Sequence, residues 1–106
     1  MSKSSYSVEI YPLAENDLDN IYKYYFEESC EETIAIKVVD ELKKAILGLS
    51  HMPKSHPIVQ EQRLKKDGFR KLIRNDYIVI FLIDEDKKKV SVVRVFHGKM
   101  NYQKYL

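Results

Sequence analysis

The segment from Tyr77 to Ile83 is an unbroken run of apolar residues, and it constrains the fold more than any other part of the chain. A strand that is apolar at every position buries both of its faces, so it belongs in the middle of a sheet. Two more strands are predicted beside it, near residues 69–75 and 89–97. Asn75-Asp76 suits a two-residue hairpin turn before the run, and residues 85–88 suit a longer turn after it.

The first half of the chain predicts one strand and two helices. Residues 6–11 alternate between polar and apolar side chains, which is typical of a strand. A proline then opens a segment with apolar residues at helical spacing, which predicts a helix over 12–28. Ser29 and Glu32 have the spacing of a capping box, so we expect a second helix that starts there and ends near Gly48. Two amphipathic helices joined by so few residues form an antiparallel hairpin.

The predicted order is β-α-α-β-β-β, an α+β fold with an antiparallel sheet and the helical hairpin packed on one face. The sheet is expected to be antiparallel through at least its last three strands. Its other face then needs a different cover, such as a partner. Residues 53–68 show little apolar periodicity and are predicted to form a surface loop. At 106 residues, the chain is expected to be a single domain over 1–106.

Composition excludes several classes of function. The lone Cys30 has no internal disulfide partner, and the three histidines have no metal-ligand spacing with it, so neither a metal nor another cofactor is expected. Only three glycines are present, too scattered for a phosphate-binding loop. The sequence contains neither the roughly 20 apolar residues of a membrane span nor a signal peptide, so no membrane partner is expected and a cytoplasmic location follows by default.

The two halves of the chain carry opposite charge. Residues 1–50 have a net charge of −5, and residues 51–106 have a net charge of +7. A basic half on a nearly neutral protein indicates an anionic partner that faces this half. The alternative is that the two sets of charges are solvated and pair with each other across the fold.

Four segments, in order, resemble the RelE/ParE superfamily of toxins from type II toxin–antitoxin modules. Pro12–Tyr22 is similar to the family's first-helix pattern, in which a small residue precedes Asp-Leu and Ile. Gly68–Leu72 resembles its Gly-aromatic-Arg-x-Leu strand, and Asn75–Phe81 resembles the strand after it. Val93–Gly98 resembles the last strand and its exit. The resemblance therefore extends over nearly the whole chain.

The resemblance implies a toxin that is neutralised by a cognate antitoxin protein. Two targets compete: cleavage of mRNA on the ribosome is the prediction, and DNA gyrase is the alternative. The RelE-like branch implies an endoribonuclease that cuts mRNA on the ribosome without a metal, and the ParE-like branch implies a poison that acts by binding DNA gyrase. A member without toxicity is a third alternative, because a shared fold does not determine activity.

For RNA cleavage, the candidate catalytic residues are His97, Arg70 and Arg94. A histidine can take or give a proton near neutral pH, and an arginine can grip a phosphate through two hydrogen bonds. The alternatives are a histidine bonded locally at a strand end, and arginines that form ion pairs or cover the core with their stems. Arg74 has no role that the sequence assigns.

Other candidates lie before and after the last three predicted strands in the sequence. RNA phosphates are the predicted ligands of Arg63, Lys65, Lys66 and Lys99. A base-stacking or proton-donating role is predicted for Tyr102 and Tyr105. Solvated lysines and a tail pinned to the core are the plainer alternatives. Close members of the family carry Arg-Arg-Asp after the last strand, whereas this chain has Lys99-Met100-Asn101, so the target stays open.

Overall fold

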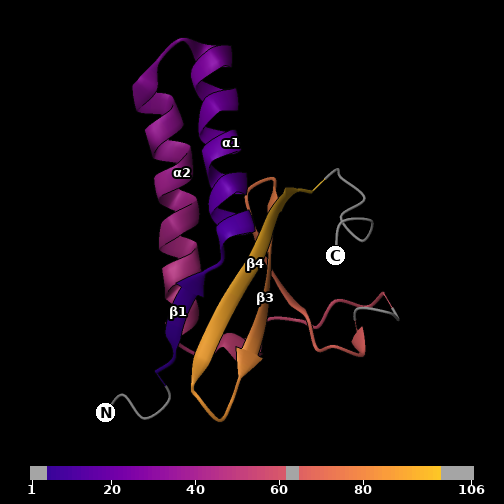
Figure 1. The fold of residues 1–106 in the computed structure, drawn as a ribbon. Helices are drawn as coiled ribbons and strands as arrows, with labels where there is room; N and C mark the ends of the chain where they lie inside the picture. The colour runs from indigo at the N-terminus through magenta and orange to yellow at the C-terminus, as the bar shows by residue number, and fades with distance from the viewer. Residues whose placement is uncertain (1–4, 62–64, 99–106) are drawn as a thin grey trace.

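The computed structural model describes residues 5–61 and 65–98, and there it shows two helices on one face of a four-stranded sheet (Figure 1). The helices are α1 (Pro12–Ser29) and α2 (Glu32–Leu47). The short 3-10 turns η1 (Gly48–Ser50) and η2 (Pro53–Ser55) come next. The strands are β1 (Ser7–Ile10), β2 (Arg70–Arg74), β3 (Tyr77–Asp84) and β4 (Lys89–His97). The predicted element order and both predicted turns are confirmed.

The strands lie in the order β1-β4-β3-β2, so β3 is an inner strand as predicted. The pairs β2–β3 and β3–β4 are antiparallel, but β1 runs parallel to β4. The sheet is therefore mixed, and the antiparallel prediction holds for its last three strands only. A tight hairpin turn forces two consecutive strands to be antiparallel, but no such turn follows β1. The helical hairpin comes next instead, so the chain can return with β4 parallel to β1.

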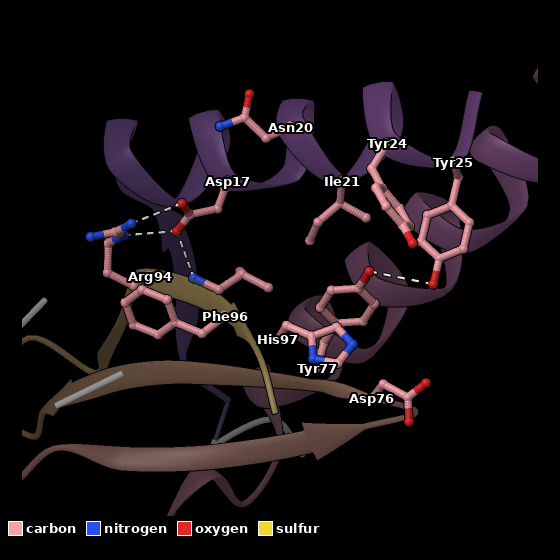
Figure 2. A pocket seen from close by; sticks show the side chains of 11 residues that line it. Asp17, Asn20, Ile21, Tyr24, Tyr25, Asp76, Tyr77, Arg94, Phe96 and His97 are labelled. Atoms are coloured by element: carbon pink, nitrogen blue, oxygen red, sulfur yellow. Dashed lines mark hydrogen bonds and ion pairs between the residues drawn. The ribbon is translucent and has the colours of Figure 1, made fainter. Parts of the chain in front are cut away.

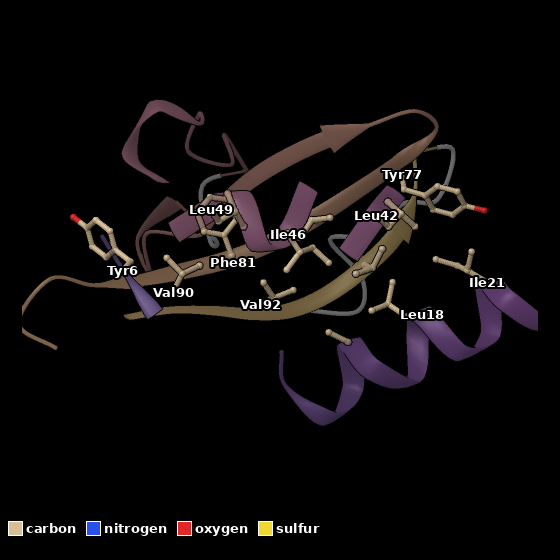
Figure 3. Close-up of a cluster of buried hydrophobic side chains, with 13 residues drawn as sticks. Tyr6, Leu18, Ile21, Leu42, Ile46, Leu49, Tyr77, Phe81, Val90 and Val92 are labelled. Atoms are coloured by element: carbon tan, nitrogen blue, oxygen red, sulfur yellow. The ribbon is translucent and has the colours of Figure 1, made fainter. Parts of the chain in front are cut away.

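The main core lies between the helices and one face of the sheet (Figure 3). Leu18 from α1 and Leu42 and Ile46 from α2 are almost completely buried there. They pack with Val79 and Phe81 of β3. The spacing of the apolar residues places them on one side of each helix, and each helix packs that side against the sheet.

The opposite face of the sheet is covered in part by the chain itself. Val59 is 1% exposed and packs with Ile78, Ile80 and Phe96. Its N–H donates to the carbonyl oxygen of Phe69 at 2.8 Å, so this segment runs beside the start of β2. The prediction of a surface loop over 53–68 was therefore wrong at Val59 and at the buried Pro53. At Val59, the face of the sheet opposite the helices therefore needs no separate partner to cover it.

The junction of the helices differs from the predicted capping box. Ser29 is the last residue of α1, and the N-cap of α2 is Glu31, whose side chain caps nothing. The Ser29 hydroxyl donates to the carbonyl oxygen of Tyr25 at 2.7 Å and accepts from the N–H of Glu31 at 3.1 Å. Cys30 has a left-handed backbone with φ 57°, which ends α1 before α2 begins.

Candidate functional site

A cleft of about 660 Å³ lies between α1 and the end of the sheet where β3 begins and β4 ends (Figure 2). Tyr24 and Tyr25 line it from α1, and Tyr77 and His97 line it from the sheet. Asp76 lies at its rim, in the turn between β2 and β3. The cleft thus combines aromatic rings with carboxylates.

The cleft exists because β1 is shorter than β4. The pairing of β1 with β4 ends at Ile10 and Val92, and the N–H of Tyr11 donates to the carbonyl oxygen of Val92 at 2.9 Å. Pro12 then starts α1, which leads the chain away. The rest of β4 has no strand on this side within the described residues, and α1 stands across the gap instead.

Asp17 joins α1 to this open part of β4. Its Oδ2 accepts a hydrogen bond from the backbone N–H of Val95 at 2.8 Å, in the place where a neighbouring strand would accept one. Arg94 donates to the same carboxylate through Nε at 2.8 Å and Nη2 at 3.0 Å (Figure 2). The side chains of Arg94 and Asp17 are only 21% and 11% exposed. Arg94 and Asp17 therefore form a partly buried, bidentate ion pair, a geometry that suits the planar guanidinium of arginine.

Arg94 also contacts an aromatic ring. Its guanidinium carbon lies 4.5 Å from the ring centroid of Phe96, within the range of a cation–π contact. The predicted phosphate-binding arginine is thus held by a carboxylate on one side and a ring on another. This is the ion-pair alternative that the sequence left open.

His97 ends β4 beside Tyr77, its partner in the β3–β4 ladder. Their ring centroids are 5.4 Å apart and the rings are nearly perpendicular. The Tyr77 hydroxyl donates to the Tyr25 hydroxyl at 3.4 Å, and the ring centroids of Tyr24 and Tyr25 are 5.2 Å apart in a T-shaped arrangement. Burial raises the pKa of Tyr77, and the bond to Tyr25 raises it further, so this hydroxyl stays protonated.

Arg70 lies at the other end of the sheet. It pairs with Phe81, four residues along β3 from the partner of His97, a separation of roughly 13 Å. Its Nη1 donates to the carbonyl oxygens of His56 at 2.7 Å and Lys54 at 3.2 Å. Arg70 and His97 are therefore not brought together, and Arg70 ties η2 and the residue after it to the sheet.

Arg74 is the β2 arginine at the level of His97. It pairs with Tyr77, which in turn pairs with His97, and directly opposed residues of antiparallel strands share a face. The exposed Lys65 and Lys66 precede β2 at its Arg70 end, away from the cleft. The remaining sequence candidates lie outside the described residues: Arg63, Lys99, Tyr102 and Tyr105.

Sequence reasoning missed Asp17, Tyr24, Tyr25 and Asp76 as members of this site. One signal was present: residues 22 and 24–26 are aromatic, and two of these, Tyr24 and Phe26, fall outside the apolar stripe of the predicted helix. Aromatic residues off the buried stripe of a helix point to a surface that contacts something else.

Residues 5–61 and 65–98 contain no group of three His, Cys, Asp or Glu residues that could hold a metal ion. None of the helices in this part of the chain is long and apolar enough to cross a membrane.

Comparison with known proteins identifies the family. Residues 8–102 match the family described as the ParE toxin of the type II toxin–antitoxin system parDE. No curated protein sequence matches the chain.

Two solved structures share the fold. The chromosomal ParDE toxin–antitoxin system from P. aeruginosa gives a TM-score of 0.73 at 19% identity, over 92% of this chain and 100% of that one. The RelBE2 toxin–antitoxin complex from Mycobacterium tuberculosis gives 0.61 at 21% identity, over 88% and 91%. Because the family match spans most of its length, the chain belongs to the ParE toxins of type II toxin–antitoxin systems, within the RelE/ParE superfamily.

Proposed function

We propose that this protein inhibits growth by binding DNA gyrase, and that a cognate antitoxin neutralises it. Its membership of the ParE toxin family supports the gyrase target, which the ParE-like branch implies. Both structural neighbours come from toxin–antitoxin systems, which supports the antitoxin. The proposed site of action is the cytoplasm, where gyrase and the antitoxin would both be met.

The observation that carries the proposal is the ion pair between Arg94 and Asp17. Cutting RNA without a metal requires cations that stabilise the charge of the phosphorane-like transition state beside the acid and the base. Arg94, the predicted catalytic arginine nearer to His97 in sequence, donates two hydrogen bonds to Asp17. Arg70, the other one, donates to backbone carbonyls at the far end of the sheet. A toxin that acts by binding gyrase does not require either arginine beside His97.

Cleavage of mRNA on the ribosome is the second candidate, and the placement of His97 favours it. The ring of His97 lies in the cleft beside Tyr77. In that mechanism His97 would take the proton of the ribose 2′-hydroxyl or give a proton to the leaving 5′-oxygen. Arg74, at the same level of the sheet, would be the nearest candidate to contact phosphate.

Induction of the chain in cells, with two readouts, tests the proposal. Gyrase poisoning predicts an SOS response and DNA trapped in cleaved complexes with gyrase, before translation falls. RNA cleavage predicts an early loss of translation and mRNA cut within codons. A His97→Ala variant sharpens the result, since loss of mRNA cuts in this variant alone would assign the activity to the second candidate. Induction with neither response would contradict both.

A further inference from the structure

The cleft beside α1 has the features of a site for a cationic side chain. Its wall on α1 includes Tyr24, a large aromatic residue that is 56% exposed. Figure 2 shows the rings of Tyr24 and Tyr25 reaching down from α1 toward Tyr77 and His97 on the sheet. Aromatic faces carry partial negative charge, and a group of them attracts cations.

The charges of the cleft point to the same ligand class. Two carboxylates line it, those of Asp17 and Asp76. Among the described residues that line the cleft, Arg94 is the only arginine or lysine, and it forms an ion pair with Asp17. Asp76 is exposed, and the bond it makes in the described part of the chain uses its backbone carbonyl, which accepts from the N–H of Gly98 at 2.6 Å. Within the described residues its carboxylate is therefore available. Two aspartates and one arginine leave the described lining of the cleft with a net negative charge.

Arg94 shows how such a ligand can be held. At one end of the cleft its guanidinium forms two hydrogen bonds with Asp17 and lies on the ring of Phe96. The rest of the cleft is lined by the same two kinds of group, an aspartate (Asp76) and tyrosine rings. A planar guanidinium satisfies a carboxylate and a ring at once, whereas a phosphate or a nucleotide would meet like charge here.

We infer that this cleft receives an arginine side chain of the antitoxin. The inference rests on the proposed antitoxin partnership, and it adds the position and the chemistry of one anchor. Tyr24 would stack on the guanidinium, and Asp76 would accept its hydrogen bonds. Buried arginine and aromatic pairs of this kind are enriched among the residues that dominate protein interfaces.

A small-molecule titration tests the chemistry without the antitoxin. The full-length chain, isotope-labelled by cell-free synthesis, is titrated with N-acetyl-arginine amide, with the neutral N-acetyl-citrulline amide, and with uridine monophosphate. We expect only the arginine compound to shift the NMR signals of Tyr24, Asp76 and His97, with saturation at millimolar concentrations. Equal shifts with citrulline, shifts with the nucleotide alone, or no shifts would overturn the inference.

Variants locate the site. Tyr24→Ala and Asp76→Asn should each weaken the arginine response about fivefold, and Tyr24→Phe should keep it because the ring remains. Asp86→Asn is the matched control, since Asp86 is an exposed aspartate in the turn between β3 and β4, outside the cleft. An equal loss in the control, or no loss in the two cleft variants, would count against the assigned residues.

The same variants are then tested on the antitoxin, defined as the co-expressed protein that restores growth. Its affinity for the Tyr24→Ala and Asp76→Asn toxins should fall about fivefold to tenfold, and replacement of one antitoxin arginine by Lys or Gln should remove this difference. Unchanged affinity in both variants refutes the inference but leaves the proposed function standing. If the wild-type chain causes no growth defect, the proposed function fails instead.

Discussion

The two ends of the sheet differ in what their polar groups contact. At the Arg70 end, charged and polar side chains bind one another or the backbone: Glu85 accepts from Tyr6 and pairs with Lys54 and Lys88. The His97 end also has one ion pair, Asp17–Arg94, but beside it aromatic rings and the Asp76 carboxylate line an open cleft. The comparison shows that two arginines considered as catalytic candidates, Arg70 and Arg94, make contacts within the fold. The residues that we propose to contact a partner are aromatic and acidic.

Replacing Phe81 by Ala should have the largest effect, because this residue is buried in the main core, which extends from the Arg70 end of the sheet to Tyr77 at the His97 end. Phe81 is completely buried in the main core, and its ring meets that of His56 edge-on at 6.0 Å. We expect a loss of about 3–5 kcal/mol in the free energy of unfolding. Urea denaturation followed by circular dichroism measures it. A loss below about 1 kcal/mol would mean that the core does not join the two ends as described.

Replacing Asp17 by Ala should destabilise the His97 end specifically. The change leaves the partly buried Arg94 without its carboxylate and the Val95 N–H without its acceptor. We expect a cost of about 2–3 kcal/mol. A double-mutant cycle with Arg94→Met should recover part of it, because the unmatched cation is then gone. Strict additivity of the two changes would contradict the ion pair.

Replacing Arg70 by Met should cost less and act at the opposite end. The variant keeps an apolar stem but loses the hydrogen bonds to the carbonyl oxygens of Lys54 and His56. We expect about 1–2 kcal/mol. Hydrogen exchange should accelerate in residues 54–59 and stay unchanged at Val95. Faster exchange at Val95 would show that the two ends are not separate.

Acid should weaken the Arg70 end through Glu85, with the smallest effect of the four. Lys54 first, then Tyr6, lowers the pKa of the Glu85 carboxyl to about 2. A carboxyl whose pKa is lower in the folded state stabilises the fold above its unfolded pKa of about 4.5, and this contribution is lost as the pH falls toward 2. Denaturation between these pH values should therefore show a steeper loss in the wild type than in Glu85→Gln. Parallel pH profiles would contradict the network.

Much of the fold could be predicted from the sequence because it depends on local patterns. The apolar run of β3, the proline that opens α1 and the stripes of the two helices all follow from the spacing of neighbouring residues. The burial of Val59 and the parallel pairing of β1 could not be predicted, because each depends on a partner distant in the chain.

The candidate site was less predictable for the same reason. The sequence singled out Arg94 and left open whether it binds a phosphate or an ion-pair partner, and that partner, Asp17, lies 77 residues away. It also grouped Arg70 with His97, although the register of β2 on β3 places Arg74 at that level. Position along a strand decides which residues meet, and composition does not encode the register.

The most direct test of the central claim, that the chain acts by binding and not by cutting RNA, uses purified components. The chain is incubated in parallel with gyrase and supercoiled DNA, and with ribosomes that carry mRNA. We predict that cleaved DNA bound to gyrase accumulates, equally with wild type and His97→Ala, and that the mRNA stays intact. Intact DNA together with mRNA cut by the wild type, but not by His97→Ala, would contradict the claim.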